Sequence, residues 1–558
     1  MSAAGRRVEL AMAILLGGSG LALADEVAPR FTDRAAERGL VAVAYSGGPD
    51  KAHILESTGN GVLVLDYDGD GDQDLYLVHA LRLDEFGRRP AEPSRLYRND
   101  GEVFVDVSGR AGVGAGIYGH GGSVGDVDGD GLPDIYLTAY GANLLYRNNG
   151  DGTFDEIGVA SGVAGDDWSI GATFFDADGD GDQDLYVANY IEAAWEEIVA
   201  ARRTRRWRER VMVMDGPRGL PEAANRFYRN QGDGTFEEAT EAAGLDDGGY
   251  GYSMGVVSFD YDRDGAPDLY VANDSTPNRL YRNSGGGLFE EVGAPAAVAY
   301  NADGRPQGSM GVGTGDADGD GWLDLAVTNF AHDYYTLYRN RRGEYFQDDS
   351  FAAGLALPTF RPLGWAALFF DADNDGDQDL FFSNGHIYPQ VDEDPTLHES
   401  YRQPNQLLLN DGGRFRDASS AAGPGFAVVE SSRGAAIVDL GSDGALEIVV
   451  SNQDAAPTLL ESHGTTGRWI GFELRPRSGA TQLLGSWVEV AFGARRAVRQ
   501  HGPGGSSASE SDPRLHFGLG GVAEVERARI EWPDGSVREL RDLTAERYYV
   551  VAPRSAGR

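Results

Sequence analysis

Short apolar runs alternate with polar turns along most of the chain. Runs such as Val62–Leu65 and Leu75–Val78 flank segments rich in Gly, Asn and Asp. Brief apolar runs bounded by turn-forming residues are typical of β-strands joined by tight loops. Beyond the N-terminus, no run reaches the roughly 18 apolar residues that a membrane-spanning helix needs. The pattern predicts an all-β protein.

An acidic string, DxDxDGxxD, recurs between these runs and divides the chain into repeats. Six full copies and a degenerate seventh, DLGSDGALE, begin at Asp66, Asp126, Asp176, Asp260, Asp316, Asp371 and Asp439. Each is preceded by a marker, a Phe followed by an acidic residue and then a Gly, at Phe31, Phe104, Phe154, Phe236, Phe289, Phe346 and Phe415. LYRN or a variant closes most units, at Leu96, Leu145, Phe227, Leu280, Leu337 and Leu407. Each unit is therefore expected to contain marker, strand, acidic loop, strand and hairpin turn.

The spacing of the acidic strings indicates the architecture. They start 50 to 84 residues apart, about 62 on average, which suits a four-stranded propeller blade with loop insertions. Seven units predict a seven-bladed β-propeller; a stacked solenoid is the alternative, but it needs capping units. The longest interval places an insertion at about 191–224, with ARRTRRWRER from Ala201. Its six arginines form either a partner-binding patch or a solvated helix or loop.

The ends of the chain differ from this repeat. Arg6 and Arg7 precede an apolar run and a small-residue pattern that ends at Ala24, which predicts a signal peptide at 1–24, the alternative being a short anchor or frayed helix. After Glu461 the acidic repeats stop and short strands predict a small β domain. We therefore expect a propeller at 25–462, a C-terminal β domain at 463–553 and a tail at 554–558.

The acidic strings have the composition of calcium loops. Calcium takes six to eight oxygen ligands, commonly carboxylates at alternate positions plus a backbone carbonyl. Position 7 of the string accepts Leu, Ala and Trp, so it can offer only its main-chain oxygen, and the Gly at position 6 permits the sharp turn. The predicted ligands are Asp66, Asp68, Asp70, Asp72, Asp74; Asp126, Asp128, Asp130, Leu132, Asp134; Asp176, Asp178, Asp180, Asp182, Asp184; Asp260, Asp262, Asp264, Ala266, Asp268; Asp316, Asp318, Asp320, Trp322, Asp324; Asp371, Asp373, Asp375, Asp377, Asp379; and Asp439, Asp443, Glu447.

Two other structures could produce these strings. An EF-hand needs a bidentate Glu at position 12, but that position is an apolar strand residue in all seven strings. Plain Asp-Gly turns are the second alternative; without metal, however, convergent carboxylates with no cation nearby would repel one another. We therefore expect about six to seven Ca²⁺ sites that stabilise the fold rather than catalyse.

Composition narrows the range of partners. The 88 acidic and 48 basic residues give a formal net charge of −40, which disfavours nucleic acid and anionic lipid as partners and favours a monomer. The absence of cysteine excludes disulfides, thiolate metal sites and cysteine nucleophiles.

Two C-terminal signatures, SESDPRLHFGLG from Ser509 and WPDG from Trp532, complete a family resemblance. With GYSMGVVSFDYDRDG from Gly251 and ANDSTPNRLYRN from Ala272, the chain resembles the cartilage acidic protein family, in which FG-GAP or VCBS-type propeller repeats precede an ASPIC/UnbV domain. The resemblance implies a secreted or periplasmic calcium-binding protein, with adhesion inferred for some members and no established enzyme activity. Cysteines that the family often carries near GPRGLP are absent, and the approach to the final motif is eroded to GGSSASESDP from Gly504.

Three functions are compatible with these expectations. The first is an adhesion or interaction module that binds an extracellular protein or glycan, without catalysis. The alternative is a polysaccharide lyase or hydrolase that uses the central channel, with His120, His332 or His386 as base; each is also explained as a histidine hydrogen-bonded in a blade turn. A cofactor-bearing propeller dehydrogenase is a third possibility, but no cofactor ligand set is present beyond the acidic loops.

Overall fold

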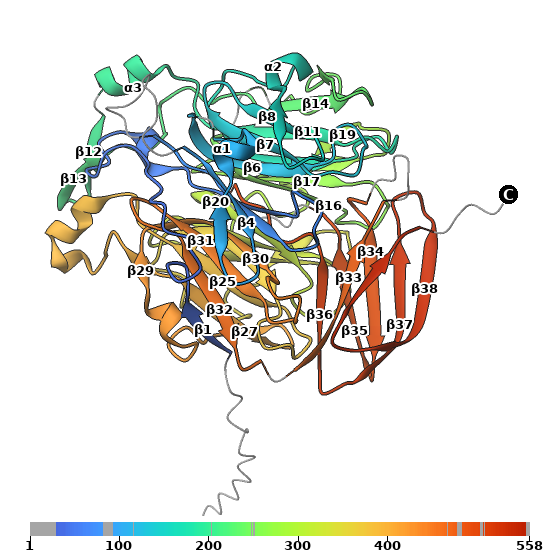
Figure 1. Ribbon diagram of the computed structural model, residues 1–558. Coiled ribbons are helices and arrows are strands. Elements are labelled where there is room, and N and C mark those ends of the chain that lie inside the picture. The colour runs from blue at the N-terminus through green and yellow to red at the C-terminus, as the bar shows by residue number, and fades with distance from the viewer. Residues whose placement is uncertain are drawn as a thin grey trace, which may run out of the picture.

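The chain forms a ring of four-stranded sheets with a smaller β domain beside it (Figure 1). The computed structural model describes residues 29–553 apart from 82–92, 115, 202, 247, 249–250, 466, 477–482, 503–505 and 507. The predicted signal peptide at 1–24 and tail at 554–558 lie outside the described residues. Apart from short helical segments, the described chain consists of strands and loops, which confirms the all-β propeller prediction.

Seven four-stranded antiparallel sheets, here called blades 1 to 7, make up the ring of described residues. From the innermost strand outward they are β2 (Val62–Leu65), β3 (Asp74–Leu77), β4 (Arg95–Asn99), β5 (Phe104–Asp106); β6 (Tyr118–Gly125), β7 (Asp134–Tyr140), β8 (Leu144–Asn148), β9 (Phe154–Glu156); β10 (Ser169–Phe175), β11 (Asp184–Asn189), β14 (Arg226–Asn230), β15 (Phe236–Glu238); β16 (Ser253–Phe259), β17 (Asp268–Asn273), β18 (Arg279–Asn283), β19 (Phe289–Glu291); β20 (Ser309–Gly315), β21 (Asp324–Asn329), β22 (Thr336–Asn340), β23 (Phe346–Asp348); β24 (Gly364–Phe370), β25 (Asp379–Asn384), β27 (Gln406–Asp411), β28 (Arg414–Asp417); and β30 (Ser432–Val438), β31 (Glu447–Asn452), β32 (Thr458–His463), β1 (Arg30–Asp33).

The ring closes through its first strand. Each innermost strand packs against the next around the ring, and β30 packs against β2. β1 pairs antiparallel with β32, with Phe31 opposite Ser462, so the start of the chain completes the last blade. Each Phe marker therefore lies on the outermost strand of the preceding blade, one strand away from the unit boundary that the sequence predicts. Closure of this kind joins the two ends of the ring within a single blade, so blade 7 holds both the start and the end of the propeller.

Buried side chains fill one end of the ring. In blades 2 to 7 a β-bulge interrupts the innermost strand six residues before the acidic loop, and a bulge re-aims the side chain it carries. Ile170, Met254, Met310 and Trp365 come together in a single apolar cluster although they belong to four different blades. Arg433 lies over the Trp365 ring at 4.2 Å. This end of the channel is therefore packed with side chains.

The predicted insertion covers that packed end. Its described residues form α3 (Trp195–Ala201) and a hairpin of β12 (Thr204–Trp207) and β13 (Val211–Met214). Val211 and Val213 join the apolar cluster at the channel, and Trp207 packs against it. The arginine-rich segment is thus neither a free loop nor a simple helix, because its alternate residues anchor it to the ring.

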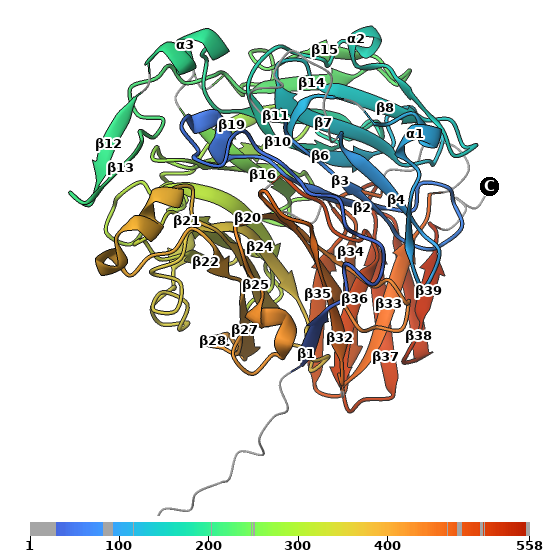
Figure 2. The same cartoon turned by 60° about the vertical axis from the view of Figure 1, so that its left-hand side comes forward.

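A two-sheet domain follows the ring. β36 (Leu515–Gly520), β33 (Arg468–Leu474) and β39 (Tyr548–Val551) form one sheet, and β35 (Arg495–Gln500), β34 (Trp487–Phe492), β37 (Glu524–Glu531) and β38 (Val537–Thr544) form the other. The two sheets enclose a core of their own. Figure 2 shows these strands on the far side of the ring from β12 and β13.

The remaining short elements lie in connections. They are α1 (Ser108–Ala111), α2 (Gly158–Ser161), the two-stranded pair β26 (Gln403–Pro404) and β29 (Val429–Glu430), and 3₁₀ turns at Ile54–Ser57, Pro389–Glu393, Pro395–Leu397 and Pro424–Ala427. Of the helices of the described residues, none is long and apolar enough to cross a membrane.

Candidate metal loops and the domain interface

The seven acidic strings, here loops 1 to 7, lie at one end of the ring. Each joins the first and second strands of its blade, so all seven lie at the same end, which we call the acidic face. The connections between second and third strands, including the insertion, lie at the other end, the opposite face.

The first Asp of each loop organises the turn. In loop 1 the Asp66 carboxylate accepts the N–H groups of Gly69 at 2.8 Å, Asp70 at 3.1 Å and Gly71 at 3.0 Å. The N–H groups of positions 5 and 6 repeat this bond in loops 2, 4, 5, 6 and 7. Position 6 has a positive φ in all seven loops, for example 96° at Gly71. The predicted need for glycine there is confirmed, since other residues rarely adopt this backbone.

The Asp at position 9 braces the loop from the side. Asp134 accepts the N–H of Val127 at 2.9 Å and that of Asn148 at 2.7 Å, so it ties the loop to the third strand of its blade. Burial raises the pKa of Asp134 to about 8, against the lowering by these bonds. Burial also raises the pKa of Asp126 to about 6, and Asp130 and Asp128 add to it. Without a cation, the fold therefore favours protons on these carboxyls.

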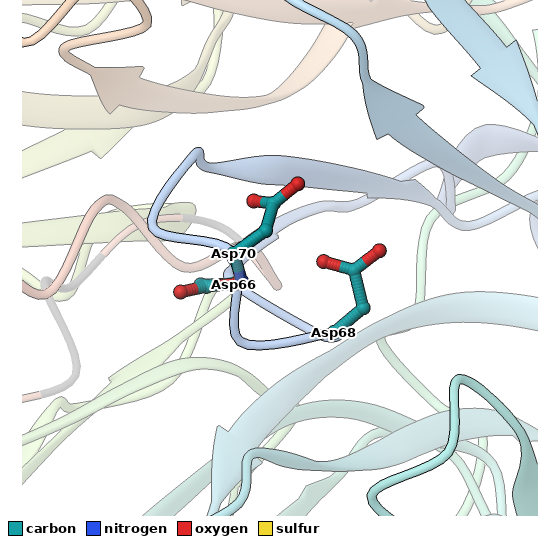
Figure 3. A group of neighbouring side chains, drawn as sticks. All are labelled: Asp66, Asp68 and Asp70. Carbon is teal, nitrogen blue, oxygen red and sulfur yellow. The ribbon is translucent and has the colours of Figure 1, made fainter.

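Carboxylate oxygens converge in the loops. Within several of them, three carboxylate oxygens lie within 4.8 Å of one another, as in Asp66, Asp68 and Asp70, or Asp126, Asp128 and Asp134. Figure 3 shows the Asp68 and Asp70 carboxylates projecting from the same side of loop 1. These groups could hold a metal ion.

Two buried oxygens support the fit to a metal. Asp128 Oδ1 and Asp318 Oδ1, both at position 3, are buried and have no hydrogen-bond partner among the described residues. A buried carboxylate oxygen without a partner is costly, and a hard cation is the ligand that such an oxygen suits. The donor set therefore fits Ca²⁺. The main-chain oxygens at position 7 and the identity of each ligand stay predictions.

The expectation that no cation lies near the carboxylates was wrong. In blades 3 to 5 the Arg of the LYRN motif reaches position 3 of its own loop: Arg282 Nε lies 2.9 Å from Asp262 Oδ2, and Arg229 Nε lies 3.5 Å from Asp178 Oδ2. Arg339 likewise pairs with Asp318 through Oδ2, whereas Oδ1 of the same carboxylate is the buried oxygen without a hydrogen-bond partner. The LYRN motif, which the sequence shows only as a unit boundary, thus places an arginine against one oxygen of the carboxylate at position 3.

The Asn of the same motif joins neighbouring blades. Asn283 Nδ2 in blade 4 donates to the Ala177 carbonyl of loop 3 at 2.7 Å. Equivalent bonds run from Asn148, Asn230, Asn340 and Asn410 to the preceding loop. Between blades 7 and 1 this bond is missing, because Asn99 Nδ2 is buried without a partner in the described chain. The loops are therefore part of the contact between blades.

The C-terminal domain covers part of the acidic face. Gln500 accepts the N–H of Asp260 in loop 4 at 3.2 Å. Arg495 donates to the Asp375 carbonyl of loop 6 at 2.6 Å, and Arg263 lies over the Trp487 ring at 4.2 Å. Blade 6 has Leu409 where the LYRN arginine would be, and Arg495 of the C-terminal domain pairs with Asp377 of this loop.

A segment of that domain enters the channel. Glu510 pairs with β2 like an extra strand: its N–H donates to the Val62 carbonyl at 2.8 Å, and its carbonyl accepts from Val64 at 3.1 Å. A Cβ on Gly61 or Gly121 would lie about 2 Å from Ala508, at 2.1 Å and 2.2 Å. The described part of the eroded GGSSASESDP stretch thus has a binding partner, the channel wall, and glycines in blades 1 and 2 make room for it.

The three histidines proposed as bases lie at the opposite face in two different settings. His120 is fully buried beside Trp168, and burial lowers its pKa to about 3. His332 and His386 instead approach the same carboxylate, that of Glu399, at 2.7 Å and 3.3 Å. Glu399 was not predicted from the sequence because no motif surrounds it.

Glu399 fastens the insertion to the ring. Its side chain is 1% exposed and accepts the Trp207 indole N–H of the insertion at 2.8 Å. Burial raises its pKa, but hydrogen bonds from its neighbours outweigh burial and lower the pKa to about 2. His386 Nδ1 accepts the Tyr388 N–H at 3.0 Å, which leaves Nε2 to donate toward Glu399. This cluster holds the insertion against the ring through a charged, hydrogen-bonded carboxylate.

Comparisons with known proteins agree with this architecture. The FG-GAP-like repeat pattern matches residues 66–137, 126–187, 211–271, 260–327 and 316–382, and the ASPIC and UnbV pattern matches 476–558. Cartilage acidic protein 1 of Homo sapiens is 25% identical over 507 residues, which are 86% of this chain and 69% of that protein. The Mus musculus protein is 26% identical over 298 residues, 52% of this chain and 42% of that protein.

Solved structures give weaker likenesses. A lectin of Agrocybe aegerita described as recognising non-reducing terminal N-acetylglucosamine has a TM-score of 0.35 and 16% identity, covering 72% of this chain and 87% of the lectin. The V. cholerae biofilm matrix protein Bap1 has a TM-score of 0.31 and 11% identity, covering 92% of this chain and 76% of that one. Neither likeness is close enough to transfer a ligand. The repeat pattern, by contrast, spans more than half of the chain, which therefore belongs to the FG-GAP-like repeat family, carries an ASPIC and UnbV segment and is similar to cartilage acidic protein 1.

Proposed function

We propose that this chain is a secreted or periplasmic interaction module whose propeller is stabilised by Ca²⁺ and binds an extracellular protein or glycan. The observation that carries the proposal is the acidic loop itself, repeated with the same hydrogen bonds around one face of the ring. Calcium would be held by the carboxylates at positions 1, 3 and 5, with position 9 as brace or ligand. Bound there, it would supply positive charge that links strand ends and offsets carboxylate repulsion.

We infer that this function is binding rather than catalysis. A central-channel enzyme needs an accessible acid and base, but buried side chains fill one end of the channel and the segment around Glu510 lies in the other. The three candidate histidines do not converge on a common open site: His120 is buried against Thr58 and Trp168, and the other two contact Glu399. Loops at the rim of a rigid ring commonly form binding surfaces, because their sequences vary while the ring holds them in place.

Export and the nature of the partner rest on composition and similarity. The net charge of −40 and the absence of cysteine suit a soluble protein that functions without disulfides. Similarity to cartilage acidic protein 1 supports a site of action outside the cytoplasm, where calcium is abundant. An acidic surface makes nucleic acid an unfavourable partner.

Thermal unfolding in millimolar calcium, magnesium or excess chelator tests the proposal. Calcium that binds only the folded chain stabilises it by about 2.7 kcal/mol for each site at a concentration of 100 times Kd. We expect a large fall in Tm with chelator that magnesium does not reverse. Identical melting curves in calcium and chelator would refute the calcium half of the proposal.

A single-loop variant makes the test specific. Asp128→Asn alters the carboxylate whose buried oxygen lacks a partner, so calorimetry should count one ion fewer. Asp411→Asn, an exposed residue outside the acidic loops, is the matched control and should leave the count unchanged. The binding half is tested by screening extracellular glycans and proteins with the loaded chain; turnover of a polysaccharide in the same samples would contradict it.

A further inference from the structure

The seventh acidic loop keeps the shape of the others but lacks one ligand. Asp439 accepts the N–H groups of Asp443 at 3.1 Å and Gly444 at 2.9 Å, as position 1 does elsewhere. Glu447 accepts the Leu440 N–H at 3.0 Å, so position 9 keeps its bracing role. Position 3, however, is Gly441. The loop therefore has the fold of a metal loop without the carboxylate that the other six offer at their third position.

The C-terminal domain places two donors on this loop. Arg514 Nη2 donates to the Asp439 carbonyl at 2.6 Å, and Nη1 donates to Ser442 Oγ at 2.8 Å. The Tyr548 hydroxyl donates to Asp439 Oδ2 at 2.8 Å. The phenol thus takes a carboxylate oxygen of position 1, which is a predicted metal ligand in loops 1 to 6. The guanidinium binds the main-chain oxygen of the same residue and the side-chain oxygen at position 4.

Asp512 fixes the orientation of the Arg514 side chain. Asp512 accepts its Nε at 2.9 Å and 3.0 Å through both carboxylate oxygens. The Asp512 N–H donates to the Ile437 carbonyl of β30 at 2.9 Å, and the Asp439 N–H donates to Asp512 Oδ2 at 3.2 Å. The Arg514 and Asp512 side chains are only 6% and 7% exposed. A bidentate, buried pair of this kind holds a guanidinium in a single orientation.

An aromatic side chain closes the contact. A Cβ on Gly444 would lie 2.2 Å from the Trp469 ring, so the indole of β33 packs directly on the turn of the loop. Trp469 in turn lies beside His516 and Tyr548, with ring centroids 5.6 Å and 5.0 Å away. The C-terminal domain therefore contacts loop 7 through a charged group, hydrogen bonds and aromatic packing.

We propose that loop 7 is a binding site for the chain's own C-terminal domain, with the positive charge of Arg514 and the hydroxyl of Tyr548 in place of a metal ion. The chain then binds six calcium ions, and the domain stays docked when calcium is removed. The count of six rests on the proposed calcium function, whereas the docking does not, so the two are measured separately.

Hydrogen exchange of the full chain, in calcium and in chelator, measures docking. We expect β36 and loop 7 to be equally protected in both conditions in the wild type. Arg514→Gln should speed their exchange by about tenfold or more. Arg541→Gln, whose 65% exposed side chain contacts Glu539, is the control and should change nothing. Wild-type protection that disappears in chelator, or Arg514→Gln behaving like the control, would overturn the proposal.

Ion counting gives an independent measurement. Native mass spectrometry of the wild type should show six bound calcium ions, and the double variant Gly441→Asp with Arg514→Gln should show seven, since an added Cβ at Gly441 meets nothing closer than the Asp443 carboxylate at 3.4 Å. Seven ions in the wild type would sink the inference. No bound ion would refute the calcium function and the count, with docking still decided by hydrogen exchange. If Arg514→Gln does not fold, Tyr548→Phe removes one hydroxyl bond and should loosen the domain less.

Discussion

The two ends of the propeller are closed by different kinds of interaction. The acidic face carries rows of carboxylates that are balanced by arginines such as Arg282 and, in our proposal, by calcium. The opposite face is closed by apolar and aromatic side chains around one buried carboxylate, Glu399. The comparison teaches that an acidic composition does not make the whole molecule dependent on ions. Stability at one face should respond to calcium, and stability at the other should not.

The largest effect of a single substitution is expected at Glu399. Glu399→Ala leaves the donors of Trp207 and His386 buried without their acceptor, so the free energy of unfolding should fall by about 3 kcal/mol. Chemical denaturation in saturating calcium measures it, with the exposed Glu393→Ala as control. The calcium count should not change. A lost ion would show that the two faces are coupled and would break the comparison.

A smaller effect is expected between blades on the acidic face. Asn283 is fully buried and donates to the carbonyls of Ala177 and Pro267 at 2.7 Å and 3.2 Å. Asn283→Ala should cost about 2 kcal/mol and weaken calcium binding at loop 3, because that loop loses its tie to blade 4. Urea unfolding and calorimetry measure both quantities. Asn149→Ala, which removes an exposed bond within its own turn, should do neither; equal effects of the two variants would argue against the blade tie.

The smallest effect is a pH dependence inside the channel. Burial raises the pKa of Glu510 to about 7, against hydrogen bonds from Val124 and Ser123. Because this pKa lies above the usual 4.5, the fold favours the neutral carboxyl, and its contribution is full below pH 4.5 and lost as the pH rises through 7.

Glu510→Gln removes that titration. The stability of the wild type relative to this variant should fall between pH 4.5 and 7, by less than about 1 kcal/mol because the side chain is partly exposed and screened. Unfolding free energies across this range, with the exposed Glu524→Gln as control, provide the measurement. A difference that stays flat with pH would place the Glu510 carboxyl in a more hydrated setting than the structure shows.

The repeat and the shape of the acidic loops follow from the sequence alone. The period of apolar runs and the glycine at position 6 predicted the all-β propeller and the sharp turn, because both depend on local backbone preferences that a few neighbouring residues set. For the same reason the string DLGSDGALE already marked loop 7 as a degenerate copy.

The surroundings of those loops depend on contacts between elements that are far apart in the chain. The strand that completes blade 7 comes from residues 30–33, the arginines that balance the loops come from the third strands, and Arg514 reaches loop 7 from 75 residues away along the chain. Glu399 likewise meets Trp207 across 192 residues. Such contacts depend on ring closure and on the docking of one domain against another. Local sequence patterns do not encode them, because a pattern records which residues are near one another in the chain and not which elements meet in space.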